Sequence, residues 1–528
     1  MTARQPLRFP SGLVAQLLLS FVAGVLAVPA FAPFYFWPLA LVSLWILFMG
    51  WQHSATPWRA FVCGFCWGLG LFAAGVSWIY VSLHVYGGMP AVLAGLATFL
   101  FCCYLALYPA LAGFFYRWTA TRFSLQPTVA LLVLMPACFV IFEYLRGWVV
   151  SGFPWLAMGY TQTPGGFIAA PLAGYAAIFG MFGVTWLLVL SVSSGMLLLR
   201  GAPGSFVSRR GRWAIGAALL VLWGTGAGLQ TYSWSEPSGA SIKVALLQGN
   251  VEQSVKWRDD QRLPTLANYH ELAMSTLAKL IVMPETALPD FLERIPQDYL
   301  DSLQQHARRS GGDILMGAPV IDRPADPLAR LNVANSAISI GTSATQRYDK
   351  RHLVAFGEFV PPLFSWVYRW LQIPLSDFSP PQGAPVPMQI AGHKVGVDIC
   401  YEDSFGAEIA AQLPEAEMLV NISNMAWFGD SLAPWQHAQM SQMRALETGR
   451  WMLRATNTGA TAAIDEKGAV VKRLPGFTRG VLEVQAQPLK GATPYVRWHD
   501  APVLLMLAAA LLASILLRDK SARPAVRG

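Results

Sequence analysis

Long apolar runs are the feature that most limits what this chain can fold into. One helix needs roughly 20 apolar residues to cross the hydrocarbon core of a bilayer. Of the 528 residues, 54% are hydrophobic and only 13% are charged, which is typical of a membrane protein. We predict eight spans, near residues 11–30, 34–50, 60–83, 91–116, 128–146, 168–199, 213–230 and 501–517. The first resembles a signal peptide, but other spans follow it closely, which favours an uncleaved helix.

The polar residues lie mainly between the seventh and eighth runs. No lysine precedes Lys243, and the only acidic residues before it are Glu143 and Glu236. From there to about residue 500 the composition is that of a globular domain. We therefore predict a transmembrane bundle of seven spans in 1–230, a folded domain in 231–500, and the last span with a tail in 501–528.

Basic residues in the short loops predict the orientation. When the connections between spans are assigned alternately to the two sides of the membrane, the basic residues gather on one side. The short loops on the opposite side carry only Arg146. The positive-inside rule then places both termini in the cytoplasm and region 231–500 outside it. The basic side carries Arg4, Arg8, Arg59, Arg117, Arg122, Arg200, Arg209, Arg210, Arg212, Arg518, Lys520, Arg523 and Arg527. Glu143 and Arg146, one helical turn apart near the outer interface, are interpreted as a local ion pair, or secondarily as a lipid head-group contact.

The formal net charge of +8 does not indicate a nucleic-acid partner. Region 231–500 holds 24 Lys and Arg against 28 Asp and Glu, a net charge of −4. The basic excess therefore belongs to the cytoplasmic membrane face, and the bilayer is the partner that it predicts.

Region 231–500 alternates apolar, strand-like runs with amphipathic, helix-like ones, which favours a layered α/β domain. The expected strands are 241–248, 280–286, 313–320, 335–341, 393–400 and 417–424, and the expected helices are 263–280, 296–312 and 434–450. One stretch, 359–375, is unusually apolar and aromatic for such a domain. It is either a core element or an arm that dips into the membrane.

Cys400 is the only cysteine after residue 138. The other five lie in apolar spans, where small packing residues are common, and the CxxC spacing of Cys63 and Cys66 has no further ligands beside it. Cys400 ends a strand-like run and has no partner for a disulfide within its domain. It is either a buried structural thiol or a nucleophile, and a nucleophile needs a nearby base or cation.

Two arrangements could activate this thiol. A Cys–His pair would use His352 or His437. A Cys–Glu–Lys triad would use Glu285 as the base and Lys350 as the cation that stabilises the oxyanion. The spacing of the residues leaves both open.

The ordered stretches "PET", "KRHLVAFGE" and "CYED" resemble the nitrilase superfamily, which implies an αββα sandwich for 231–500. The eight-span layout resembles the apolipoprotein N-acyltransferase family. The stretches "FYFWPLAL", "EYLRGW", "SGFPW", "QGNVEQSVKW" and "WFGDSLAPWQH" carry the same resemblance. This sequence departs from the usual pattern at Met283, Ala355 and Met425, none of which is a triad position.

The resemblance implies a bacterial inner-membrane enzyme with its catalytic domain in the periplasm. It would move an acyl chain from a phospholipid, typically phosphatidylethanolamine, through a Cys400 thioester to the N-terminal amine of a diacylglyceryl apolipoprotein. Glu285 would be the base and Lys350 the oxyanion cation, with no metal or cofactor. It further implies that Glu358 orients Lys350 and that the site is lined by Trp257, Tyr401, Glu402 and Trp427. The alternatives are a membrane-tethered amidase that uses water, and a transporter or lipid-binding scaffold without activity.

Overall fold

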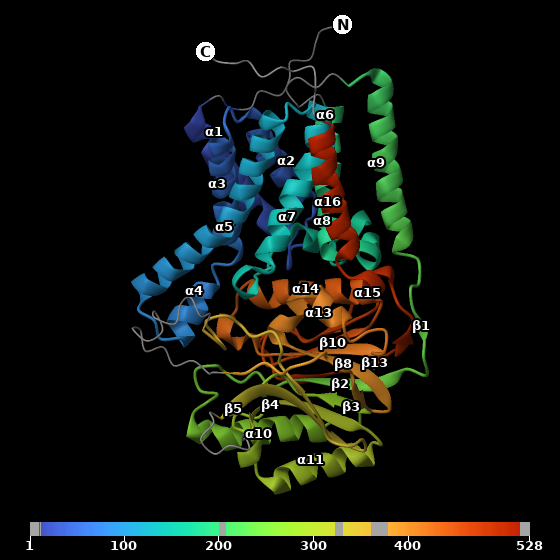
Figure 1. Cartoon of the computed structure of the whole chain (residues 1–528). Helices are drawn as coiled ribbons and strands as arrows, with labels where there is room; N and C mark the ends of the chain where they lie inside the picture. The colour runs from blue at the N-terminus through green and yellow to red at the C-terminus, as the bar shows by residue number, and fades with distance from the viewer. Residues whose placement is uncertain (1–9, 11, 200–206, 323–330, 361–377, 518–528) are drawn as a thin grey trace.

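The computed structural model describes residues 10, 12–199, 207–322, 331–360 and 378–517. They form two stacked parts, a bundle of long helices and a domain built on two β-sheets (Figure 1). Most of the predicted apolar arm 359–375, from residue 361 onward, lies outside the described residues.

A long helix occupies each of the eight predicted spans. They are α1 (Leu13–Ala27), α2 (Pro38–His53), α3 (Pro57–Gly75), α5 (Ala91–Arg122), α7 (Met135–Arg146), α8 (Ala176–Leu198), α9 (Arg209–Leu229) and α16 (Ala501–Leu516), with the short helices α4 (Ile79–Val81) and α6 (Pro127–Val129) between them. Within the described part of the chain, six helical stretches are long and apolar enough to cross a membrane. Three of these stretches are longer than the helices named above, because Leu13–Ala30 includes the helical turn after α1, Pro127–Arg146 includes α6 and the turn before α7, and Pro171–Leu198 includes the helical turn before α8. The helices α2 and α16 have only 16 residues each and are not among the six. The structure thus contains a bundle of apolar helices of membrane-spanning length, whereas the count of eight spans and their orientation stay predictions.

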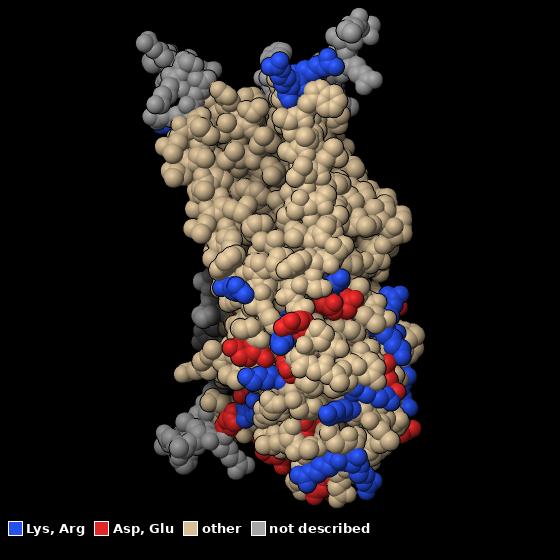
Figure 2. Space-filling view, turned by 90° about the vertical axis from the view of Figure 1, so that its right-hand side faces the viewer, with Lys and Arg blue, Asp and Glu red and all other residues tan. Residues whose placement is uncertain are grey.

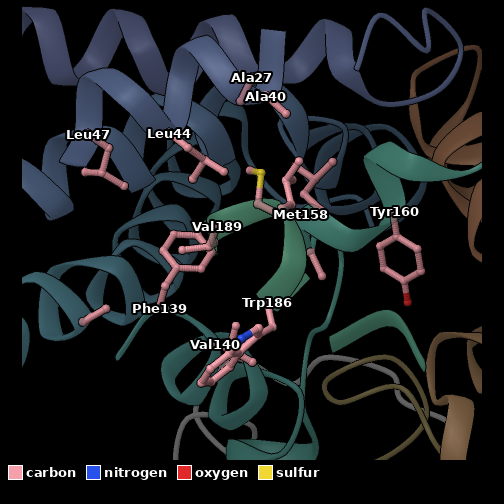
Figure 3. Packing of buried hydrophobic residues seen from close by; sticks show 14 of the residues in the cluster. Ala27, Ala40, Leu44, Leu47, Phe139, Val140, Met158, Tyr160, Trp186 and Val189 are labelled. Atoms are coloured by element: carbon pink, nitrogen blue, oxygen red, sulfur yellow. The ribbon is translucent and has the colours of Figure 1, made fainter. Parts of the chain in front are cut away.

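Small residues let the bundle helices approach one another closely. A Cβ added to Gly24 in α1 would overlap the backbone oxygen of Trp67 in α3. Membrane helices rely on such contacts because apolar side chains gain little by leaving lipid for protein. Cys63 and Cys138 lie in the same buried core. Figure 3 shows part of that core, with Leu44, Leu47, Phe139, Val140, Trp186 and Val189 among its labelled residues.

Two six-stranded sheets make up the second part. One sheet has the order β13-β2-β3-β4-β5-β6 and the other β12-β11-β10-β9-β8-β7. The first contains β2 (Ile242–Gln248), β3 (Leu280–Val282), β4 (Asp313–Asp322), β5 (Asn332–Gly341), β6 (Gln346–Asp349) and β13 (Gly480–Ala486). The second contains β7 (Met388–Ile390), β8 (His393–Ile399), β9 (Met418–Ser423), β10 (Met452–Thr456), β11 (Ala462–Ile464) and β12 (Val470–Arg473). A short pair, β1 (Glu236–Pro237) and β14 (Leu489–Lys490), lies apart from both.

The sheets pack face to face over one apolar core. Val244 and Val282 of the first sheet share this core with Val397 and Val420 of the second. The helices α10 (Asp259–Met274) and α11 (Gln297–Arg309) cover the outer face of the first sheet. On the second sheet lie α13 (Gly406–Ala410), α14 (Ala433–Thr448) and α15 (Pro494–Trp498). The predicted αββα sandwich is thus present.

Helix α14 lies between the second sheet and the bundle (Figure 1), and all but one of its residues are buried. Its glutamines join the two parts. Gln439 accepts a hydrogen bond from the Ala32 backbone and donates to the Tyr160 carbonyl, at 3.0 and 2.9 Å. Gln442 accepts one from the Tyr35 hydroxyl at 2.8 Å. The sandwich therefore sits on the bundle through specific polar contacts.

Candidate active site

Each of the three predicted catalytic side chains follows the carboxyl end of a strand. Glu285 comes three residues after β3, Lys350 directly after β6, and Cys400 directly after β8. The first two strands belong to one sheet and the third to the other. The three residues meet where the two sheets face each other, because β5 and β6 lie against β8 and β7.

Lys350 is the centre of a buried polar cluster. Its Nζ lies 3.2 Å from Oε1 of Glu285 and 2.8 Å from Oε1 of Glu358. Asn335, in β5, donates to the same two oxygens at 2.8 and 3.2 Å. Burial lowers the pKa of Lys350, but the two carboxylates outweigh it, so that pKa lies well above its usual range. Lys350 is therefore a permanent cation.

The second oxygen of Glu285 is also held. Oε2 accepts a hydrogen bond from the backbone nitrogen of Asn424 at 2.8 Å. Burial raises the pKa of the Glu285 carboxyl, but Lys350 and the donors Asn335 and Asn424 bring it below its ordinary value. Glu285 is thus an ionised acceptor with a fixed orientation, which a general base requires.

Cys400 lies on a sharp turn at the end of β8. Its φ of 56° is in the left-handed region, which costs a residue other than glycine about 1–3 kcal/mol. The carbonyl oxygen of Cys400 lies 3.0 Å from His437 Nε2 and accepts from Asn421 Nδ2 at 3.2 Å, and these contacts hold the turn. Burial raises the pKa of the thiol, Glu285 raises it further, and Lys350 opposes them. The thiol is therefore protonated at rest.

Glu402 connects the Cys400 turn to the Lys350 turn. One carboxylate oxygen accepts from the backbone nitrogens of Arg351 and His352 at 2.6 and 3.2 Å, and the other from that of Ile399 at 2.6 Å. The Tyr348 hydroxyl donates to both oxygens, at 3.1 and 3.2 Å. Glu402 is buried, so it acts through these backbone contacts and does not line an open pocket.

The titration of Glu402 gives a testable prediction. Burial raises its pKa to about 7, although the backbone donors lower it. Between a pKa of about 4.3 in the unfolded chain and 7 in the folded one, only the folded protein keeps the proton. The stabilising contribution of Glu402 is therefore complete below about pH 4.3 and falls by up to about 1.4 kcal/mol per pH unit as the pH rises to about 7.

Glutamine at this position cannot titrate. We expect the unfolding free energy of the wild type minus that of Glu402→Gln to shrink between about pH 5 and pH 7 and to stay constant above it. Denaturant unfolding in detergent at several pH values measures this difference. A difference that is flat across this range would contradict the prediction.

The two predicted tryptophans lie at the rim of the site. Trp257 is 49% exposed and Trp427 is 38% exposed. The ring of Trp427 lies edge-on to Tyr86 of the bundle, with centroids 6.4 Å apart. Tyr401, in contrast, is buried, and its hydroxyl donates to the carbonyl oxygen of Gly152 at 2.9 Å.

The two histidines are engaged elsewhere, which weighs against a Cys–His pair. His352 places Nδ1 2.9 Å from Glu408 and Nε2 2.8 Å from the Ser151 carbonyl. His437 places Nε2 2.6 Å from Asp403 and Nδ1 2.5 Å from Arg454. Asp403, for which the sequence suggested no role, holds this buried group beneath the nucleophile turn.

Asn335, Asn424 and Lys256 are site residues that sequence reasoning missed. Asn335 and Asn424 are polar side chains at the ends of buried strand runs, a signal that could have suggested them. Lys256 is fully buried, and its Nζ donates to the Thr286 hydroxyl at 2.6 Å. Burial lowers the pKa of Lys256 to about 7, opposed by Glu285. The family resemblance selected its neighbour Trp257, whereas a lysine is usually an exposed surface residue, so nothing in the sequence marked Lys256.

The sandwich, with a carboxylate, a lysine and a cysteine at strand ends, defines a domain of the carbon–nitrogen hydrolase class. Residues 243–495 match the family model described as "Carbon-nitrogen hydrolase". Residues 23–194 match the model described as "Apolipoprotein N-acyltransferase N-terminal domain". Among solved structures, a mutant of the Nesterenkonia AN1 amidase from the nitrilase superfamily aligns with a TM-score of 0.35 and 17% identity, covering 51% of this chain and 98% of that one.

Curated relatives match almost the whole chain. The apolipoprotein N-acyltransferase of Nitrosomonas europaea is 45% identical, with 95% of this chain and 97% of the relative covered. That of Methylococcus capsulatus is 43% identical, over 93% and 94% of the two chains. That of Chromobacterium violaceum is 41% identical, over 98% and 96%. The chain belongs to the apolipoprotein N-acyltransferase family and is an acyltransferase of the bacterial inner membrane.

Proposed function

We propose that this enzyme transfers an acyl chain from a membrane phospholipid to the N-terminal amine of the diacylglyceryl-cysteine of apolipoproteins, the last step of lipoprotein maturation. The acyl chain passes through a thioester on Cys400. The observation that carries this proposal is the Lys350 cluster, which holds an ionised Glu285 and a permanent cation beside a thiol. Glu285, Lys350 and Cys400 are the proposed catalytic residues.

In the first half-reaction, Glu285 takes the proton of the Cys400 thiol while the sulfur attacks the ester carbonyl of the phospholipid. Because the thiol pKa is raised and the Glu285 pKa is lowered, a free thiolate is disfavoured. The proton therefore leaves as the carbon–sulfur bond forms, which is general-base catalysis. Lys350 stabilises the negative oxygen of the tetrahedral intermediate. The ester C–O bond then breaks, Glu285 returns the proton to the leaving oxygen, and a lysophospholipid departs.

In the second half-reaction, the neutral amine of the lipoprotein attacks the thioester. Glu285 takes a proton from the attacking nitrogen, and Lys350 again stabilises the oxyanion. The carbon–sulfur bond breaks, the sulfur of Cys400 regains the proton, and an amide remains on the lipoprotein. Glu358 orients Lys350, and the exposed rings of Trp257 and Trp427 shape the approach of the two lipids. The buried Tyr401 supports the Cys400 turn from within, through its bond to Gly152.

We further propose that all eight helices span the membrane, with 1–230 and 501–528 forming the membrane part and 231–500 the periplasmic domain. Figure 2 supports this, because the bundle surface shows a broad band without charged side chains and basic side chains at its far end. Exposed aromatic residues mark two levels, as at membrane interfaces. Trp58, Trp118 and Trp213 belong to the ends of α3, α5 and α9 that lie remote from the sandwich (Figure 1), whereas Trp148 follows α7, Tyr232 follows α9 and Trp498 ends α15. Both termini would then be cytoplasmic.

The placement of the site at the membrane surface suits its substrates. Drawing a lipid chain into water costs about 0.8 kcal/mol per CH₂ group, so neither lipid can leave the bilayer to react. We propose phosphatidylethanolamine as the donor. An amidase for small soluble substrates has no need of a membrane bundle, and a scaffold without activity has no need of the Glu285–Lys350–Cys400 cluster.

The test is to incubate the purified full-length protein with a phosphatidylethanolamine that carries different chains at sn-1 and sn-2, and to measure its intact mass. We expect one acyl adduct, of the sn-1 chain, that hydroxylamine removes and that a diacylglyceryl-cysteine peptide discharges as an N-acyl product. A phosphatidylglycerol with the same chains tests the head-group preference. Absence of the adduct, together with ammonia release from small amides, would establish the amidase instead.

A further inference from the structure

The segment 147–163, which follows α7 and contains the stretch "SGFPW", has a strained backbone. Val150, Ser151 and Leu156 have positive φ, of 56°, 75° and 56°. A left-handed conformation at a β-branched residue such as Val150 is rare. Such strain persists only where the surroundings hold the chain in place, and it gathers at functional sites. We name this segment the bundle cradle.

Arg146, at the end of α7, holds the bundle cradle from the bundle side. Its side chain is 3% exposed, and Nη1 donates to the carbonyl oxygens of Phe153 and Trp155, each at 2.6 Å. Glu143 accepts from the backbone nitrogen of Met158 at 2.8 Å. The Arg146–Glu143 separation is 4.0 Å, at the outer limit of an ion pair. The predicted local ion pair is therefore present, and both charged side chains also bond to the cradle.

The side of the bundle cradle that faces the sandwich contacts the active-site turns. The Gly152 carbonyl accepts from the Tyr401 hydroxyl at 2.9 Å, and the Ser151 carbonyl lies 2.8 Å from His352 Nε2. The Trp155 ring stacks on Tyr401 and on His437, with centroids 6.5 and 5.4 Å away.

These partners flank the reacting groups. Tyr401 follows Cys400, His352 lies two residues after Lys350, and His437 contacts the Cys400 carbonyl. The cradle therefore touches both sides of the catalytic cluster at once.

We propose that Arg146 is a positioning residue for acyl transfer: through the bundle cradle it sets the place of Cys400 relative to Lys350. This inference deepens the proposed function and rests on it. The membrane bundle is then a part of the catalytic apparatus as well as an anchor. A guanidinium suits this role, since its planar fork of donors holds two carbonyl groups at once, which a lysine ammonium does with less directional control.

The test compares full-length Arg146→Met and Arg146→Lys with the control Ser43→Ala. Ser43 is also buried in the bundle and bonded there, to Ala23 and Trp67, but it does not contact the cradle. We expect Arg146→Met to slow Cys400 acylation by at least about 10-fold with an unchanged KM for phospholipid, and Arg146→Lys to recover part of the rate. Ser43→Ala should stay within about twofold of the wild type, and its Tm shows how much rate is lost per degree of destabilisation alone.

A double-mutant cycle with Tyr401→Phe tests the route of the effect. If Arg146 acts through the Gly152–Tyr401 contact, the two rate losses are less than multiplicative. Multiplicative losses, or a rate loss that follows Tm equally in Ser43→Ala, would overturn the proposal. The alkylation rate of Cys400 by iodoacetamide, localised by peptide mass, is measured in parallel. It reports thiol placement even if the wild type forms no thioester, so failure of the proposed function is recognised separately.

Discussion

Replacement of Cys400 by alanine is expected to abolish acyl transfer while leaving the fold intact. The proposed reaction has no route to the amide without the sulfur, and loss of a covalent nucleophile commonly costs about 10⁴-fold or more in rate. The side chain is small, and the hydrogen bonds that hold its turn use the carbonyl oxygen of Cys400. In the intact-mass assay the hydroxylamine-labile adduct should vanish, and N-acylation of the acceptor peptide should fall to background. An adduct that persists in Cys400→Ala would place the thioester on another residue.

The strained turn provides an internal control for this variant. Because residue 400 has a φ of 56°, glycine fits the turn better than alanine. Cys400→Gly should be as inactive as Cys400→Ala but more stable by about 1 kcal/mol, seen as a higher Tm. If the alanine variant proved equal or more stable, the turn would not be held in the left-handed conformation.

Replacement of Lys350 by methionine is expected to damage both stability and activity. Glu285 and Glu358 would lose the cation that lies 3.2 and 2.8 Å from them, which leaves a buried and a partly buried carboxylate beside each other. Breaking a buried ion pair costs about 3–5 kcal/mol. The pKa of Glu285 would rise, which weakens it as an acceptor, and the oxyanion would lose its donor, worth about 10²–10³ in rate. Tm in detergent and the acylation rate measure the two effects.

Lys243→Met is the matched control for this substitution. Lys243 also forms a 2.8 Å ion pair, with Glu483, but the two side chains are 41% and 39% exposed. Such surface pairs contribute about 0–1 kcal/mol. We expect full activity and a small change in Tm. If the two variants lost equal stability, burial of the Lys350 cluster would not be what makes it important.

The triad positions could be proposed from the sequence, but their geometry could not. "PET", "KRHLVAFGE" and "CYED" lie far apart in the chain, and only the family resemblance selected Glu285 and Lys350 over the histidines. His437 illustrates the difficulty. From the sequence it is a plausible partner for the Cys400 thiol, yet in the structure it contacts Asp403, Arg454 and the Cys400 carbonyl oxygen. Which groups a polar side chain meets depends on contacts between distant strands, which spacing does not encode.

Helix α14 shows the same limit at the level of packing. Its sequence predicts an amphipathic helix, whose polar side would ordinarily face water. Instead Gln439, Gln442 and Glu447 are buried against the bundle, where Gln439 and Gln442 bond to Tyr160 and Tyr35 and Glu447 accepts from Met181 at 2.8 Å. The polar side of α14 was expected to face water, but it is buried because the sandwich docks on the bundle through this helix.

The sequence alone determined the membrane bundle and the layered α/β domain, because apolar run length and strand periodicity are local properties that act wherever they occur. It also singled out Cys400. Other features arise from contacts in the folded chain. Asn335 and Asn424 hold Glu285, and the buried Glu402 joins the Cys400 turn to the Lys350 turn. Arg146 supports the active-site turns from inside the bundle. These contacts join segments that are remote in sequence, and they depend on how the two sheets and the bundle pack together. A local sequence pattern therefore does not predict them.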